Sequence, residues 1–329
     1  MLNDAWIIVI LLGQSSALLL TILSVYFALP IMRYWEPGGT RPLQIELERK
    51  TFFVSTAAQY ILVFQFIIFF AFLFTINSYL PLLITGAMCA SGILSLSVFG
   101  YPALYIKIAA LILCLIFIFL NRLDMAEPGY PLTPDKYYVL PIILVFLLTD
   151  TYITIRFFSE IKADVIATCC SISFSAGDIL QKRQAAYFIP ANYTPVLYYL
   201  SFTAFLLLIL RSPAKLKTLF FLELIHLPLS VLVLKYQFVK YIYALPSHDC
   251  LFDLFFPQYY VIGYLLFAAL FISFTAVVWL NILRMVENRL SRDFHFLKKR
   301  LYRIALGGNV LFILIVHLYW AYWKLIILE

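Results

Sequence analysis

The residues best suited to chemistry in this chain are its cysteines. The 329 residues include five of them: Cys89, Cys114, Cys169, Cys170 and Cys250. In an oxidising compartment cysteines form disulfides, and an accessible thiolate can attack a disulfide while a second thiol resolves the mixed intermediate. Whether these five can act together depends on the elements that carry them, and above all on the side of a membrane to which each one belongs.

The composition places the chain in a membrane. Apolar residues make up 64% of the sequence and charged residues only 12%, far from the balance of a soluble domain. Because lipid cannot hydrogen-bond exposed backbone groups, these long apolar blocks predict helices, and the fold class is an all-α polytopic transmembrane bundle. The net charge of +7 comes from short connectors between the blocks, so we expect the lipid bilayer, and no nucleic acid, as the partner of this basic chain.

Apolar blocks separated by charged or Pro/Gly-rich breaks predict about eight spans in a single transmembrane domain over residues 1–329. The stretch 81–99 is nearly long enough for a ninth span. Its proline and glycines favour a re-entrant or surface helix instead. The predicted spans lie near 6–32, 53–76, 102–121, 137–157, 192–210, 218–237, 258–284 and 304–327.

The cations predict an N-out, C-out orientation, because Lys and Arg concentrate in cytoplasmic loops. The first span is too long for a signal-peptide core, so no cleaved leader is expected. The compact loops favour a bacterial inner membrane. With the N-terminus outside, most of the 24 cations fall in inner loops, namely Arg33, Arg41, Arg49, Lys50, Arg122, Lys136, Arg211, Lys215, Lys217, Arg284, Arg289, Arg292, Lys298, Lys299, Arg300 and Arg303.

This orientation places four of the five cysteines on the outer face. Cys89 falls in the outer segment 77–101, Cys169 and Cys170 in 158–191, and Cys250 in 238–257, whereas Cys114 lies within a span as a small packing residue. We therefore predict that these four are the catalytic residues of thiol–disulfide exchange. Electrons would pass between a soluble periplasmic thioredoxin-like protein and a membrane acceptor, possibly a quinone.

Two other interpretations of the cysteines stay open. The four could form structural disulfides in a transporter, or in a non-catalytic membrane subunit of a larger complex. Alternatively, Met88, Cys89, His248 and Cys250 offer soft and borderline ligands for an outer-face copper or zinc site. The chain contains no Cys-x-x-Cys-His sequence, so covalent c-type haem is not indicated.

The distribution of outward cysteines on a helical bundle resembles that of membrane quinone-linked disulfide oxidoreductases and of the vitamin K epoxide reductase family. The resemblance implies electron transfer between thiols and a quinone. Those families place a Cys-x-x-Cys at a helix end, and neither Met88-Cys89 nor Cys169-Cys170 matches it. No residue role is therefore transferred from them.

Ionisable residues inside spans form a second group of candidates, because charge at membrane depth is costly. Lys107 and Asp150 lie at comparable depth in the third and fourth spans and are positioned to pair, either as a structural ion pair or as a proton or anion site. Glu223 and His226 lie three residues apart, hence on one face of the sixth span.

Overall fold

The computed structural model describes residues 1–327 except for 3, 38, 40, 163–189, 212–214, 246–247 and 292. Within this part of the chain, eight helices are long and apolar enough to cross a membrane. The stretch 81–99 contributes only the short helices α3 (Leu80–Leu83) and α4 (Ala90–Leu94), so it is not a ninth spanning helix. The all-α class and the prediction of eight spans are confirmed.

The chain divides into two compact units. The first comprises Met1–Ala167 with Val286–Asp293, and the second comprises Thr168–Met285 with Phe294–Glu329. The sequence predicted a single transmembrane domain and gave no sign of this division. Each unit is built on four long helices.

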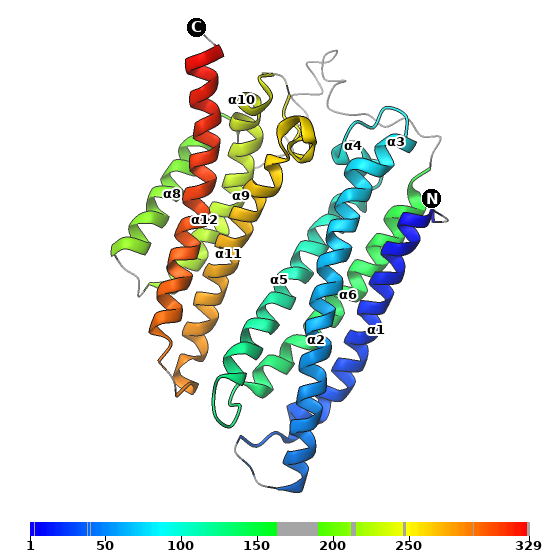
Figure 1. Cartoon of the computed structure of the whole chain (residues 1–329), viewed down its shortest axis with the longest axis vertical. Helices are drawn as coiled ribbons and strands as arrows, with labels where there is room; N and C mark the ends of the chain where they lie inside the picture. The colour runs from blue at the N-terminus through cyan, green and yellow to red at the C-terminus, as the bar shows by residue number, and fades with distance from the viewer. Residues whose placement is uncertain are drawn as a thin grey trace. The chain divides into compact units, whose positions relative to one another are not determined.

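In the first unit, α1 (Ala5–Tyr34), α2 (Pro42–Phe74), α5 (Gly100–Met125) and α6 (Thr133–Glu160) run alongside one another (Figure 1). Helix α1 packs against α2 and α6, and α5 packs against the same two helices. The Asp4 carboxylate starts α1 by accepting the backbone N–H of Trp6 at 2.9 Å, as an N-cap does. Helix α2 runs on through the π-helical turn η1 (Thr75–Tyr79) into α3.

The second unit contains α8 (Thr194–Arg211), α9 (Leu216–Val233), α11 (Ile262–Val286) and α12 (His295–Tyr322). Helix α9 continues through the π-helical turn η3 (Leu234–Phe238) into α10 (Val239–Tyr243). The connector to α11 holds two 3-10 turns, η4 (Phe252–Phe255) and η5 (Pro257–Tyr259), and another π-helical turn, η7 (Trp323–Ile327), follows α12. The 3-10 turn η6 (Glu287–Arg289) follows α11 and belongs to the first unit.

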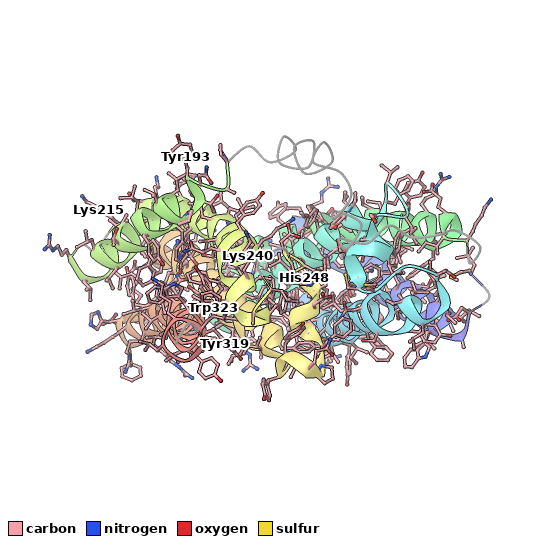
Figure 2. The ribbon with its side chains drawn as sticks, turned by 90° about the horizontal axis from the view of Figure 1, so that it is seen from above. Tyr193, Lys215, Lys240, His248, Tyr319 and Trp323 are labelled. Atoms are coloured by element: carbon pink, nitrogen blue, oxygen red, sulfur yellow. The ribbon has the colours of Figure 1, made fainter. Side chains whose placement is uncertain are left out.

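Aromatic side chains gather at one end of the second unit. Figure 2 looks down on this end, with Lys240, His248, Tyr319 and Trp323 labelled. The rings of Tyr241, in α10, and Trp323 lie 5.4 Å apart. Such amphipathic rings prefer the boundary between lipid and water, so their position agrees with a helix end at the membrane surface.

Helix α12 begins earlier than the sequence predicts. The eighth span was expected from residue 304, but the helix starts at His295 and its first turns hold Lys298, Lys299, Arg300 and Arg303. Hydropathy detects only the apolar part of a helix, because cationic first turns can extend into the aqueous layer beyond the hydrocarbon. The second span extends beyond its predicted bounds at both ends for a similar reason, from Pro42 to Leu83.

The two units have the same succession of elements. In each, the second long helix ends in a π-helical turn and a further α-helical turn, followed by a connector with short helices and one cysteine, Cys89 or Cys250. A π-helical turn is rare and often marks a functional position, so its recurrence at the same place is informative. A single buried face on each helix would be too general to indicate such a relation.

Side-chain details of the two units also correspond. At the start of the third long helix, Gly100 lies against the backbone of Leu94, and Gly263 lies against Leu254, so closely that a Cβ atom at either glycine would collide. At its far end, the sequence Leu-Asn-x-Leu-x-Met occurs at Leu120–Met125 and again at Leu280–Met285. The shared details indicate an internal repeat of a four-helix unit.

Another close approach joins α11 and α12 inside the second unit. A Cβ at Gly308 would lie 2.5 Å from the carbonyl oxygen of Ala269 and 2.9 Å from the Cβ of Ser273. Small residues let membrane helices approach this closely. Beside it, Gly307 has nothing within 4 Å of its Cβ position, so only one of the two glycines is needed for packing.

Candidate functional site

Cys89 lies in the connector of the first unit, directly before α4. It is 1% exposed and its extended backbone caps the short helix. The side chain of Asn77, in the π-helical turn, accepts the backbone N–H of the next residue, Ala90, at 3.1 Å. The π-helical turn therefore fixes the backbone that carries the thiol, as a functional side chain requires.

Cys250 lies at the corresponding place in the second unit and is 3% exposed. The Tyr243 hydroxyl, from α10, donates to the carbonyl oxygen of Cys250 at 2.7 Å. As in the first unit, a side chain from the end of the second helix holds the connector at the cysteine. Tyr243 was missed in the sequence analysis, and only the position of a tyrosine seven residues before a cysteine could have suggested it.

A polar group surrounds Cys250. The His248 ring nitrogen Nε2 lies 2.5 Å from an oxygen of Asp253, and the Cys250 sulfur lies within 4.8 Å of that carboxylate. Burial, followed by the charge of Asp253, raises the pKa of the nearby Tyr259 hydroxyl. A thiol beside a His–carboxylate pair has a proton acceptor close by, which thiol chemistry needs.

The remaining cysteines differ in their positions. Cys169 and Cys170 lie outside the described residues, so their predicted role as attacker and resolver stays a prediction. Cys114 lies inside α5, 3% exposed among apolar neighbours, as expected of a packing residue.

The predicted metal ligands are not all alike. Met88 is 63% exposed while Cys89, its neighbour, is buried. His248 already contacts Asp253, so the described part of the second unit gathers His248, Cys250 and Asp253, with borderline and hard donors suited to zinc. This set differs from the predicted one because Asp253 takes part.

The structure pairs Lys107 and Asp150 within the first unit. The Lys107 ammonium donates to both oxygens of Asp150, at 3.0 and 3.1 Å, and both side chains are fully buried. Gln14, from α1, and Thr154 complete the carboxylate with bonds of 2.6 and 3.2 Å. The ammonium also lies 5.2 Å from the centre of the Phe72 ring, from α2, a cation–π contact. All four long helices of the unit meet at this pair.

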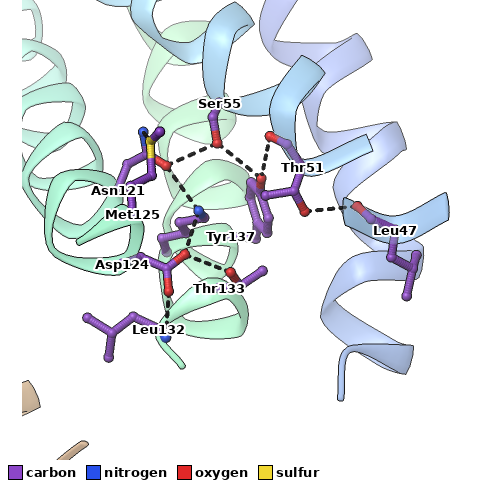
Figure 3. Close-up of polar contacts among 10 residues, drawn as sticks. Leu47, Thr51, Ser55, Asn121, Asp124, Met125, Leu132, Thr133 and Tyr137 are labelled. Atoms are coloured by element: carbon purple, nitrogen blue, oxygen red, sulfur yellow. Dashed lines mark hydrogen bonds and ion pairs between the residues drawn. The ribbon is translucent and has the colours of Figure 1, made fainter. Parts of the chain in front are cut away.

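A second buried ion pair lies near the turn between α5 and α6 (Figure 3). Lys136 donates to Asp124 at 2.6 Å and to Asn121 at 3.0 Å. The other bonds of Asp124 come from the backbone N–H of Leu132 and the hydroxyl of Thr133. This cation was assigned to an inner loop, but it is fully buried.

The same network reaches α2. Ser55 donates to the Asn121 side-chain oxygen at 3.0 Å, and the Tyr137 hydroxyl donates to the Thr51 carbonyl oxygen at 3.0 Å. Both carboxylate oxygens of Asp124 thus accept hydrogen bonds, which lets a charge pair stay buried. The signal for this network in the sequence was an acidic residue, Asp124, and a basic residue, Lys136, on either side of the short connector between α5 and α6.

Glu223 and His226 occupy the interior of the second unit, both 1% exposed. Glu223 contacts Asn309 of α12 and Ser273 of α11. His226 lies 2.7 Å from the hydroxyl of Ser201, in α8, and its ring stacks on Tyr198 at 5.3 Å. The two residues share one buried face but meet different helices, so the structure does not bring them into one site.

Comparison with models of known protein families, with curated proteins and with solved structures finds no match to this chain. The chain is a multi-pass helical membrane protein of the lipid bilayer.

Proposed function

We propose that this protein is a membrane component of thiol–disulfide exchange on the outer face of its membrane, which we infer to be a bacterial inner membrane. The observation that carries the proposal is the recurrence of one buried cysteine, Cys89 or Cys250, in the connector after the π-helical turn that ends the second long helix of each unit. Cysteines placed for packing alone would have no reason to follow the same rare turn twice. The charge distribution supports an outer position for both.

The chemistry proceeds by exchange. A thiolate of the chain attacks one sulfur of a disulfide in a soluble thioredoxin-like partner, and the partner's other sulfur leaves as a thiolate. A second thiol of the chain then attacks the mixed disulfide and releases the reduced partner, leaving a disulfide in the chain. In the reverse direction, the chain's disulfide oxidises the two thiols of a reduced partner and becomes a dithiol; a membrane quinone would supply the oxidant that takes two electrons and two protons from this dithiol.

The four outer cysteines would divide this work by accessibility. Cys89 and Cys250 are buried, so they suit the inner steps, away from solvent oxidants. Cys169 and Cys170 belong to the segment between α6 and α8 and are proposed as the pair that meets the partner. A separate entry pair would let the buried cysteines exchange electrons with the partner alone and not with other thiols.

The thiol states in intact cells test this proposal. We expect a mass-tagging alkylating reagent to report that outer cysteines change between oxidised and reduced states when cells move from oxidising to mildly reducing medium. The matched control is Cys114, which is buried in the middle of α5 and should keep one state throughout. Disulfides that never change state would mean that the cysteines only hold the loops together.

A second candidate function is transport, as a transporter or as the membrane subunit of a larger complex. It is favoured by the buried ionisable residues Lys107, Asp150 and Glu223 inside helices long enough to span the membrane, because such groups often line substrate or proton paths. On this view the cysteines are staples. A third, an outer-face metal site, rests on the donors around Cys250.

A further inference from the structure

Glu223 differs from the other carboxylates buried in the long helices. Asp150 and Asp124 each have a lysine ammonium within 3.0 Å. Among the described residues, no Lys, Arg or His lies within ion-pair distance of Glu223, whose partners are Ser273 and Asn309. An ionised carboxylate buried without a countercharge is very costly, and such a group stays neutral instead.

The hydrogen bonds of Ser273 indicate that the carboxyl group of Glu223 carries a proton. The Ser273 oxygen lies 2.8 Å from the carbonyl oxygen of Ala305 and 3.2 Å from Oε1 of Glu223. A hydroxyl has one hydrogen, and a carbonyl oxygen can only accept. The shorter contact therefore takes the serine's hydrogen, and the bond to Glu223 is complete only if the carboxyl group itself donates, as a protonated acid does.

The side chain of Asn309 can hydrogen-bond to Glu223 in either protonation state of the carboxyl group. Its amide nitrogen lies 3.2 Å from Oε2 of Glu223, a bond that suits a carboxylate. Its amide oxygen is buried without a hydrogen-bond partner in the described part of the chain. Rotation of the amide by half a turn would direct this acceptor towards a protonated Glu223, so one residue can serve both the acid and its anion.

We propose that Glu223, Ser273 and Asn309 form a proton-binding site inside the second unit, independent of the cysteines. The ligand is a single proton. On α2 of the first unit, Gln65 is a buried neutral residue ten positions before the π-helical turn η1, whereas Glu223 lies eleven positions before η3.

The nearest titratable group on the same helix is His226, and its ring contacts other residues. Its ring lies 2.7 Å from Ser201 and 3.4 Å from Ser230 and stacks on Tyr198 and Phe205. From α11 and α12 the groups that contact Glu223 are the uncharged Ser273 and Asn309. Protonation of this site is therefore expected to follow Glu223 alone.

Infrared spectroscopy of the full chain in lipid vesicles tests the proposal. At neutral pH we expect a carbonyl band of a protonated carboxylic acid that shifts in heavy water, disappears in Glu223→Gln and persists in the control Glu46→Gln, which removes a carboxylate paired with Lys50. The band should fall as the pH is raised and return when it is lowered. Since Gln resembles the neutral acid in shape, Glu223→Gln is expected to fold.

Each possible result supports or overturns the proposed proton-binding site. If no band is lost in Glu223→Gln, the carboxyl is ionised and the proposal is wrong. If the band is lost in the variant but stays constant at every pH in the wild-type protein, the acid is a fixed structural group and no proton is exchanged. Should Glu223→Gln fail to fold, Ser273→Ala removes the acceptor of the acid, and a band shifted by this variant supports the site while an unmoved band overturns it.

Discussion

Replacement of Asp150 by asparagine is expected to lower the free energy of unfolding by about 3–5 kcal/mol. The change keeps the size of the side chain, but Gln14 and Thr154 donate to different oxygens of Asp150, so the amide can accept only one of these two bonds. It leaves the Lys107 ammonium buried without its countercharge, at a point where four helices meet. Removing one partner of a buried ion pair is costly for this reason, whereas removing both can be nearly neutral.

The design includes two controls, measured by denaturant titration in mixed detergent–lipid micelles. The double variant Lys107→Met with Asp150→Asn has no unpaired charge and should recover most of the loss. Glu46→Gln disrupts the more exposed pair with Lys50 and should change stability by less than about 1 kcal/mol. A single Asp150→Asn variant as stable as the wild-type protein would show that the pair does not tie the four helices together.

Replacement of Gly308 by alanine is expected to lower the free energy of unfolding by about 1–3 kcal/mol. The new methyl group would meet the Ala269 carbonyl at 2.5 Å, so α12 must move away from α11 and weaken their packing. This displacement would also disturb Ser273, which lies against the same glycine. The same denaturant titration gives the measurement.

Gly307 provides the matched control because it is the preceding residue on the same helix. Its Cβ position is open, and alanine is a better helix former than glycine. Gly307→Ala should therefore leave stability unchanged or raise it by up to about 1 kcal/mol. Equal losses at the two positions would contradict the close approach of α11 and α12.

Hydropathy and charge were enough to predict the helical class, the eight spans and that 81–99 is not a ninth span. They also placed Lys107 and Asp150 at one depth, because two consecutive antiparallel helices of known length fix the height of each residue. These predictions succeed because a membrane helix is defined by length and polarity, two properties that a single sequence carries directly.

The buried network around Lys136 was beyond such reasoning. A lysine next to a turn looks the same in sequence whether it faces water or folds back onto Asp124, and only the packing of α2 against α5 decides. The spacing of Glu223 and His226 likewise gave a shared face but not the helices that each residue meets. Tertiary neighbours of a polar residue are not encoded in its local spacing.

The internal repeat was missed because its period is close to half of the chain. This period is far longer than the 20–50 residues of solenoid and propeller repeats, and the shared sequence is short, chiefly Leu-Asn-x-Leu-x-Met. The π-helical turns made it visible, because backbone geometry persists where side chains have changed. With the repeat in view, Cys89 and Cys250 become corresponding residues instead of two isolated thiols.

Trapping of a mixed disulfide tests the proposed thiol exchange most directly. Cys89, Cys169, Cys170 and Cys250 are replaced by alanine one at a time, cells are treated with an alkylating reagent, and the chain is examined on non-reducing gels with mass spectrometry of any adduct. Removing a resolving thiol should leave the chain covalently joined to a soluble thiol protein, released by reductant, while Cys114→Ala gives no adduct. If all four variants accumulate to the wild-type level and none traps a partner, the protein does not carry out thiol exchange.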